Sequence, residues 1–154
     1  MNQTVGILGT GNMGYPISHH VVEDGHPVVV YDLMYDAAVE KYAGTGISVA
    51  RTPQELVERA DVILLLVKDT SITQKNIDRE NGLLEGLNGK KIFVDMTTSD
   101  PQESAKLGKR ILEAGAHYMD SPMTGGQLGA LNRQLVLMAS GDPAVFERVR
   151  GILE

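Results

Sequence analysis

A glycine-rich turn near the start of the chain constrains the fold more than any other feature. An apolar run over 5–8 leads directly into the pattern G-x-G-x-x-G, formed by Gly9, Thr10, Gly11, Asn12, Met13 and Gly14. In a βαβ unit, Gly9 allows the tight turn, Gly11 lets phosphates approach the backbone, and Gly14 lets the following helix pack closely. The helix N-terminus also offers unpaired N–H groups and a positive dipole end. The turn therefore predicts a dinucleotide site.

An acidic residue follows at the position that such a site requires. A second apolar run over 27–31 ends in Asp32, and an acid about 20 residues beyond the first glycine binds the adenosine ribose hydroxyls. A carboxylate repels the 2′-phosphate of NADP, and the nearest arginine along the chain, Arg51, follows the next expected strand. We expect NAD in preference to NADP; the alternatives are NADP itself, or an Asp32 that only starts a turn.

Composition narrows the class of protein. The 154 residues are 42% hydrophobic and contain no cysteine, so we expect one globular domain over 1–154 without disulfides. Lys plus Arg number 14 against 20 Asp plus Glu, a net charge of −6, with no basic block to bind nucleic acid. No apolar run approaches the length of about 18 residues that spans a membrane, and no signal peptide is visible. A cytoplasmic location is consistent with these observations.

The order of apolar runs and capping signals alternates between strands and helices. Such alternation predicts an α/β fold with a Rossmann-like, doubly wound and mostly parallel sheet. A long glycine-bearing loop is expected after Asp120, and the strand beyond it reads as an antiparallel addition at the sheet edge. The expected strands are 3–8, 27–32, 46–49, 61–67, 90–95, 116–120 and 135–139, and the expected helices are 12–24, 35–43, 53–60, 71–78, 101–114 and 143–154.

The last expected helix carries an apolar stripe that must be buried against something. It contains Val145, Phe146, Val149, Ile152 and Leu153, and no capping glycine or loop follows Glu154. We therefore expect the domain to be truncated at or within this helix and to belong to a larger architecture. A stripe left partly exposed would make the chain self-associate.

A second turn has the chemistry of a carboxylate site. The segment 120–130 reads D-S-P-M-T-G-G-Q-L-G-A, and Thr124, Gly125 and Gly126 offer one hydroxyl and two unobstructed backbone N–H groups. Ligands of open α/β sheets bind beyond the carboxyl ends of the strands. Since Asp32, Thr98 and Thr124 each follow an expected strand, we expect them to line one crevice.

These blocks, together with the stretch Val94-Asp95-Met96-Thr97-Thr98 and Pro101, resemble the β-hydroxyacid dehydrogenase family. That family includes 3-hydroxyisobutyrate dehydrogenase, tartronate semialdehyde reductase and, more distantly, 6-phosphogluconate dehydrogenase. The resemblance implies hydride transfer between NAD(P) and a small β-hydroxyacid or its semialdehyde. It also implies a carboxylate substrate held by Thr124, Gly125 and Gly126, a nicotinamide end near Thr98, and a cofactor passing Leu66, Val67 and Lys68.

The chain departs from the family pattern at three places. Val67-Lys68 stands where members usually have Leu-Pro, and Lys68 either alters the cofactor channel or is solvated. Arg133 stands near a position where family members usually have glycine. It either recognises a charged group of the substrate or is an exposed loop arginine. The family's acid/base lysine belongs to a G-x-x-x-K-x-x-x-N helix that opens an all-helical second domain, and no lysine of this chain has that context.

That missing lysine sets what we expect of the chain as a whole. No catalytic residue is assigned within 1–154, because the family lysine would lie beyond Glu154. We expect the chain alone to be inactive, and the full-length protein to be a homo-oligomer built by its helical domain. The alternative is a stand-alone dinucleotide-binding sensor; an imine reductase fits less well, because such enzymes generally lack the Thr-Gly-Gly turn.

We expect no metal site. Asp95 and Asp120 end strands, but no further ligands are spaced around them. We expect both carboxylates to accept backbone N–H groups of the loops that follow. His19, His20 and His26 are expected to be packed or exposed to solvent and not catalytic, and His117 is expected to be structural.

Overall fold

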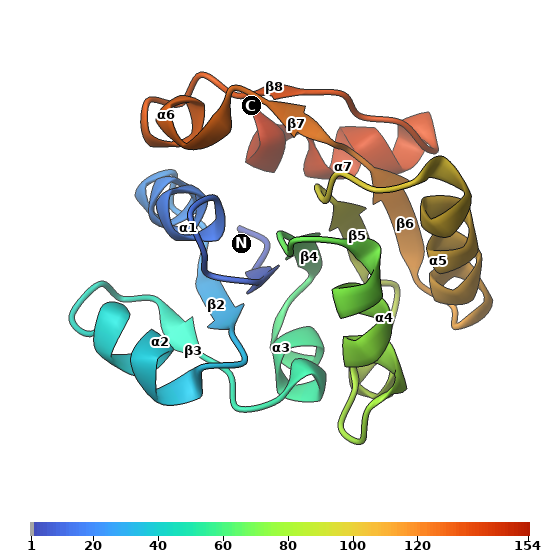
Figure 1. The fold of residues 1–154 in the computed structure, drawn as a ribbon, viewed down its shortest axis with the longest axis horizontal. Coiled ribbons are helices and arrows are strands. Elements are labelled where there is room, and N and C mark those ends of the chain that lie inside the picture. Colours follow the sequence, from blue (N-terminus) through green and yellow to red (C-terminus); the bar gives the residue numbers. More distant parts are fainter. Residues whose placement is uncertain (1) are drawn as a thin grey trace.

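A computed structural model describes residues 2–154. Its centre is a six-stranded parallel sheet in the order β3-β2-β1-β4-β5-β6 (Figure 1). The strand order reverses between β1 and β4, as in a Rossmann-like fold. The predicted α/β fold with a doubly wound sheet is therefore confirmed. The strands are β1 Val5–Leu8, β2 Val28–Tyr31, β3 Ser48–Val49, β4 Val62–Leu65, β5 Ile92–Asp95 and β6 His117–Asp120.

Helices cover both faces of the sheet. On one face, α1 and α7 bury Val21, Val145 and Val149 against β1 and β4. On the other face, α3, α4 and α5 pack against the opposite side chains of the same strands. Figure 1 shows α2 beside the β3 edge. The helices are α1 Gly14–Glu23, α2 Tyr35–Lys41, α3 Pro53–Arg59, α4 Thr70–Asp78, α5 Pro101–Glu113, α6 Gly126–Leu131 and α7 Pro143–Leu153, with a 3₁₀ turn, η1, over Leu83–Gly86.

The apolar run at the centre of the chain forms the central strand β4. Val62 and Leu64 belong to the core on the α1 and α7 side, and Ile63 and Leu65 to the core on the other side. All four residues are buried. A strand covered on both faces needs no polar alternation, which explains the continuous apolar run.

Capping side chains start three of the helices where the sequence predicts them. Thr52 accepts a hydrogen bond from the Glu55 amide at 3.1 Å, and Asp100 and Asp142 each accept one at 2.8 Å from the second residue of α5 and α7. Proline occupies the first position of each of these helices. There its missing N–H costs no hydrogen bond.

The segment after Asp120 differs from the expected loop. It contains a short strand, β7 Met123–Thr124, and the helix α6, both absent from the sequence-based assignment. The following strand, β8 Val136–Leu137, is antiparallel as expected, but it pairs with β7 and not with the edge of the main sheet. A single bridge between Asp120 and Ser140 connects this unit to the end of β6. The glycines at the start of α6 hide the helix, because glycine has low helix propensity.

The stripe on α7 is buried at two of its five positions and partly exposed at the other three, in line with the expectation from the sequence. Val145 is 4% exposed and Val149 is fully buried, while Phe146, Ile152 and Leu153 pack against the same core. The large exposed apolar side chains include Leu128 and Leu131 of α6, Val136 of β8, and Met138 just beyond it. Across residues 2–154, no helix has the length and apolar character to cross a membrane.

Candidate cofactor site

The glycine turn lies at the carboxyl end of β1, beside the point where the strand order reverses. Gly9 has φ of +99°, and a Cβ there would collide with the Leu66 carbonyl oxygen. A Cβ at Gly14 would collide with the carbonyl oxygen of Gly9, so this glycine closes the turn on itself. Gly11 is different, because a Cβ there would meet nothing within 4 Å. Its lack of a side chain leaves open space in front of the turn.

The end of β2 is tied to this turn through Asp32. Its Oδ2 accepts hydrogen bonds from the Thr10 amide at 2.9 Å and the Thr10 hydroxyl at 2.7 Å, and its Oδ1 accepts one from the Met34 amide at 3.1 Å. Lys41 holds the turn from another side, since its Nζ donates to the Thr10 carbonyl oxygen at 2.7 Å and lies over the ring of Tyr15. The carboxylate therefore fixes the shape of the turn.

Asp32 is charged at neutral pH. Partial burial disfavours the carboxylate, but hydrogen bonds from Thr10 and Met34, together with the nearby Lys41 ammonium, outweigh it and lower the pKa of Asp32. A negative charge therefore stands at the end of β2.

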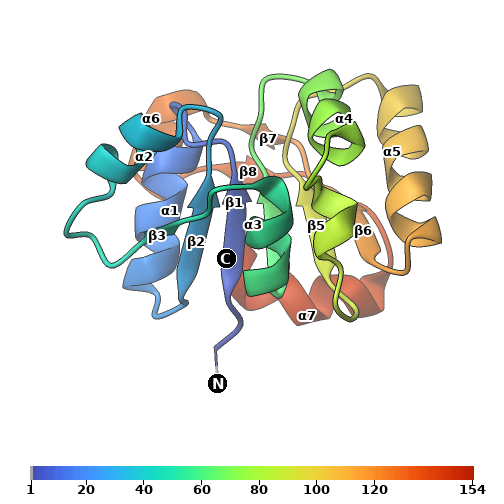
Figure 2. The same cartoon turned by 90° about the horizontal axis from the view of Figure 1, so that it is seen from below.

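Two clefts open along the carboxyl ends of the strands, the end of the sheet where α6 and β7 lie in Figure 2. The first has a volume of about 520 Å³ and includes Gly9, Asp32, Leu33, Ile72, Lys75 and Arg79 in its lining; we name it the adenosine cleft after the half of the cofactor that the sequence predicts at Asp32. The second has a volume of about 250 Å³ and includes Met13, Leu66, Lys68, Thr98, Met123 and Gly126; we name it the nicotinamide cleft after the half predicted at Thr98. Val67 lines both clefts. Residues from distant parts of the chain thus line two neighbouring clefts.

The family follows from comparison with known proteins. Residues 4–154 match the model of the NAD-binding domain of 6-phosphogluconate dehydrogenase. The chain belongs to this family.

Relatives of known name agree with this assignment. The chain is 31% identical over 150 residues to the mitochondrial 3-hydroxyisobutyrate dehydrogenase of Mus musculus, covering 97% of this chain and 44% of that protein. It is also 31% identical over 150 residues to 2-hydroxy-3-oxopropionate reductase of Escherichia coli, covering 97% of this chain and 51% of that protein. The chain therefore spans about half the length of these relatives, both of which are oxidoreductases.

A solved structure shows the same fold. The 3-hydroxyisobutyrate dehydrogenase of Mycobacterium tuberculosis, with L-serine, superposes with a TM-score of 0.91 at 29% identity. The match covers 100% of this chain and 52% of that one. The fold is therefore the NAD(P)-binding fold of this group of oxidoreductases.

Within this NAD-binding domain, most of the site residues expected from the sequence lie at the two clefts. Thr98 is exposed in the nicotinamide cleft, whereas its neighbour Thr97 is buried and bonded to the Asp95 carboxylate. Gly126 lines the same cleft, but Thr124 and Gly125 do not. Lys68 lines the cleft and is also exposed to solvent. The two alternatives for Lys68, a place in the cofactor channel and a solvated side chain, therefore do not exclude each other.

Two basic residues of the adenosine cleft were missed at the sequence level. Lys75 and Arg79 belong to α4 and to the residue after it, far along the chain from Asp32. Arg51, the arginine considered instead, lies over the ring of Tyr35 at 4.8 Å. Only the fold brings α4 beside the end of β2, so no local signal could have identified these two residues.

The two strand-end aspartates behave differently. Asp95 is fully buried and accepts hydrogen bonds from the Thr97 amide and the Tyr118 hydroxyl, each at 3.0 Å, as expected of a carboxylate that orders its loop. Asp120 pairs with Ser140 through its backbone, while burial and the charge of Asp95 raise the pKa of its carboxyl. Within residues 2–154, no three histidine or acidic side chains are grouped as a metal site would require.

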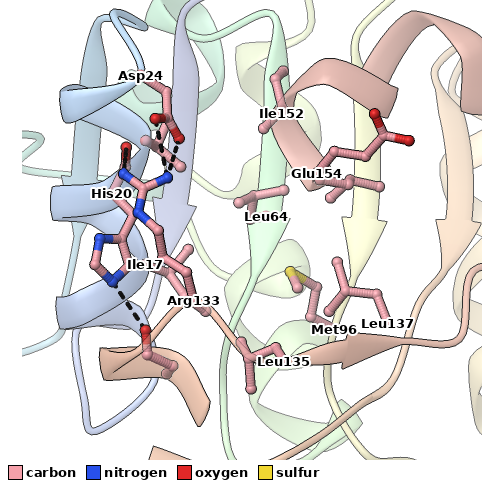
Figure 3. A pocket seen from close by; sticks show the side chains of 13 residues that line it. Ile17, His20, Asp24, Leu64, Met96, Arg133, Leu135, Leu137, Ile152 and Glu154 are labelled. Carbon is pink, nitrogen blue, oxygen red and sulfur yellow. Dashed lines mark hydrogen bonds and ion pairs between the residues drawn. The ribbon is translucent and has the colours of Figure 1, made fainter. Parts of the chain in front are cut away.

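Arg133 is an exposed arginine in the turn after α6, the second of the two alternatives considered for it. Figure 3 shows its guanidinium turned towards α1, where it pairs with Asp24 at 2.8 Å and Glu23 at 3.0 Å and donates to the His20 carbonyl oxygen at 3.3 Å. The ring of His20 in turn bonds the carbonyl oxygen of Ala130 at 3.0 Å. These contacts attach the end of α6 to the end of α1, so Arg133 is a structural anchor.

Proposed function

We propose that this chain is the cofactor-binding part of an NAD(P)-dependent oxidoreductase acting on small β-hydroxyacids or their semialdehydes. The observation that carries the proposal is that the adenosine and nicotinamide clefts lie next to each other, with Val67 in the lining of both. An elongated dinucleotide would extend past Val67, from Asp32 to Thr98. Nicotinamide supplies hydride transfer when such a cofactor is bound.

The residues along this path fit a dinucleotide. The open space at Gly11 lets a pyrophosphate approach the backbone. Among the hydrogen bonds of residues 2–154, none uses the amides of Gly11, Asn12 or Met13 as donors, which leaves them available to an anion at the start of α1. Asp32 would bind the adenosine ribose, and Leu66 and Lys68 would border the nicotinamide half.

The substrate side of the proposal rests on the Thr-Gly-Gly turn. Thr124, Gly125 and Gly126 are exposed, and Gly126 borders the nicotinamide cleft. Their hydroxyl and amide donors would hold a carboxylate, which suits 3-hydroxyisobutyrate or a related hydroxyacid. The L-serine with the Mycobacterium tuberculosis relative is such a molecule, a carboxylate with a β-hydroxyl.

When the carbon that bears the hydroxyl gives up a hydride, the hydroxyl oxygen must also give its proton to a base, so that a carbonyl forms. No side chain of 1–154 is assigned this role, and we propose that a lysine outside these residues performs it in a longer, cytoplasmic, homo-oligomeric protein. The chain alone should bind cofactor and turn over little. A stand-alone sensor would bind cofactor equally well, so only turnover by a longer protein would separate the two functions.

Calorimetric titration of the chain with NADH and with NADPH tests the proposal. We expect NADH to bind and NADPH to bind more weakly, because the charged Asp32 repels a 2′-phosphate. Preference for NADPH would contradict the role given to Asp32. Binding of neither dinucleotide would refute the cofactor assignment.

A further inference from the structure

The adenosine cleft has walls of opposite charge. Asp32 stands on one side, at the end of β2, and Lys75 and Arg79 stand on the other, on and just after α4. Among residues 2–154, neither cation forms an ion pair with a carboxylate. Their positive charge is therefore available to a ligand in the cleft.

Arg79 is held in place by the strand that carries Asp32. Its Nη1 donates a hydrogen bond at 2.7 Å to the hydroxyl of Tyr31, the residue directly before Asp32. Tyr31 is only 4% exposed, so it gives the guanidinium a fixed partner at the cleft wall. Lys75 lies one turn earlier on α4 and lines the same cleft. The two cations thus form a basic wall near the expected ribose position.

We propose that this basic wall is a latent acceptor for the 2′-phosphate of NADP, and that the Asp32 carboxylate alone keeps the cleft selective for NAD. The inference rests on the proposed cofactor site and extends it. A 2′-phosphate beside Asp32 meets repulsion from the carboxylate and attraction from Lys75 and Arg79. Guanidinium and ammonium groups are the usual protein partners of phosphate. Neutralising Asp32 leaves only the attraction.

The test compares four chains by calorimetric titration with NADH and NADPH. They are wild type, Asp32→Asn, Asp32→Asn with Lys75→Ala and Arg79→Ala, and Asp32→Asn with Lys109→Ala. Lys109 is an exposed lysine of α5 outside the cleft, so its variant controls for the loss of a surface cation. Asparagine keeps the shape of Asp32 and one acceptor for the Thr10 amide.

We expect Asp32→Asn to shift the ratio of NADPH to NADH affinity towards NADPH by about tenfold or more. The added Lys75→Ala and Arg79→Ala changes should remove most of that shift, and Lys109→Ala should leave it intact. If the shift persists after both cations are removed, the basic wall is not the phosphate acceptor. The proposal is also overturned if the wild type binds NADH but Asp32→Asn causes no shift. Wild type that binds neither dinucleotide refutes the cofactor site itself, and the inference with it.

A second comparison keeps the test valid if Asp32→Asn does not fold. In the wild-type background, Lys75→Ala with Arg79→Ala should weaken NADPH binding more than NADH binding, because only NADPH carries the additional phosphate. Equal losses for the two dinucleotides would overturn the proposal. Circular dichroism of each variant reports whether it is folded.

Discussion

The three glycines of the first turn impose different physical requirements. A side chain at Gly9 would collide with the Leu66 carbonyl oxygen and one at Gly14 with the Gly9 carbonyl oxygen, whereas a side chain at Gly11 would project into open space. The sequence motif predicts a separate role for each glycine. In the structure, the fold itself requires glycine at Gly9 and Gly14 but places no steric limit at Gly11, where the proposed requirement comes from a ligand that approaches the backbone.

Alanine variants separate these requirements. Gly11→Ala should leave stability nearly unchanged and weaken NADH binding by about tenfold or more, which is about 1.4 kcal/mol. Gly14→Ala should lower the free energy of unfolding by about 1–3 kcal/mol, because the turn must shift to admit the Cβ. Urea denaturation and calorimetry measure the two effects.

Gly151 of α7 provides the matched control, since a Cβ there meets nothing within 4 Å. Gly151→Ala should bind NADH normally and gain about 0.5–1 kcal/mol of stability from helix propensity. If Gly11→Ala binds NADH as the wild type does, no phosphate lies against this turn.

At the scale of elements, the attachment of α6 to α1 links the two predicted binding turns. The glycine turn begins α1, and the Thr-Gly-Gly turn begins α6, while Arg133 and His20 join the far ends of the two helices (Figure 3). Arg133 itself has φ of +55°, a left-handed conformation that glycine adopts more readily. Its ion pairs therefore compensate for an unfavourable backbone.

Two substitutions at Arg133 should separate the stabilisation by its ion pairs from the cost of its left-handed backbone conformation. Arg133→Ala loses the contacts to Asp24 and Glu23 and keeps the unfavourable conformation, so its melting temperature should fall by a few degrees. Arg133→Gly loses the same contacts but relieves the backbone, and should melt between Arg133→Ala and the wild type. High salt should reduce both differences, because these pairs are partly exposed to solvent.

Thermal unfolding at low and high salt measures these differences in melting temperature. Arg148→Ala, which alters an exposed arginine of α7, is the control. An Arg133→Ala chain that melts like the wild type at low salt would show that the anchor contributes nothing to stability.

At the scale of the whole molecule, the structure shows exposed apolar surface at places other than the stripe on α7. The stripe on α7 packs on the sheet and is partly exposed. Of the large exposed apolar side chains, one group lies on α6 and along β8, which are beside each other in Figure 1. Single exposed apolar residues are common, but several on one short unit favour association. We expect the chain to self-associate through Leu128, Leu131, Val136 and Met138.

Sedimentation velocity over a range of concentrations tests this expectation. Wild type should associate as its concentration rises, and Leu128→Glu should shift it towards monomer. Leu112→Glu alters a comparably exposed leucine, 56% against 73%, on α5 and should have no effect. A wild type that stays monomeric at high concentration contradicts the expectation.

The sequence alone determined the features that depend on local physical chemistry. The glycine turn followed Val5–Leu8, the capped prolines began α3, α5 and α7, and the continuous apolar run formed the central strand. Each of these signals lies within a few residues of the structure it specifies. The fold class and the family could be predicted for that reason, and so could the positions of Asp32 and Thr98 at strand ends.

Only the tertiary structure decided which distant residues meet. The fold places α4 across a cleft from the end of β2, so that Lys75 and Arg79 line the same cleft as Asp32. The fold also turns Arg133 towards α1, packs the stripe of α7 against the sheet, and forms α6 despite its glycines. These outcomes depend on packing between segments that are far apart in the chain. The free energy of such contacts cannot be inferred from any short stretch of the sequence.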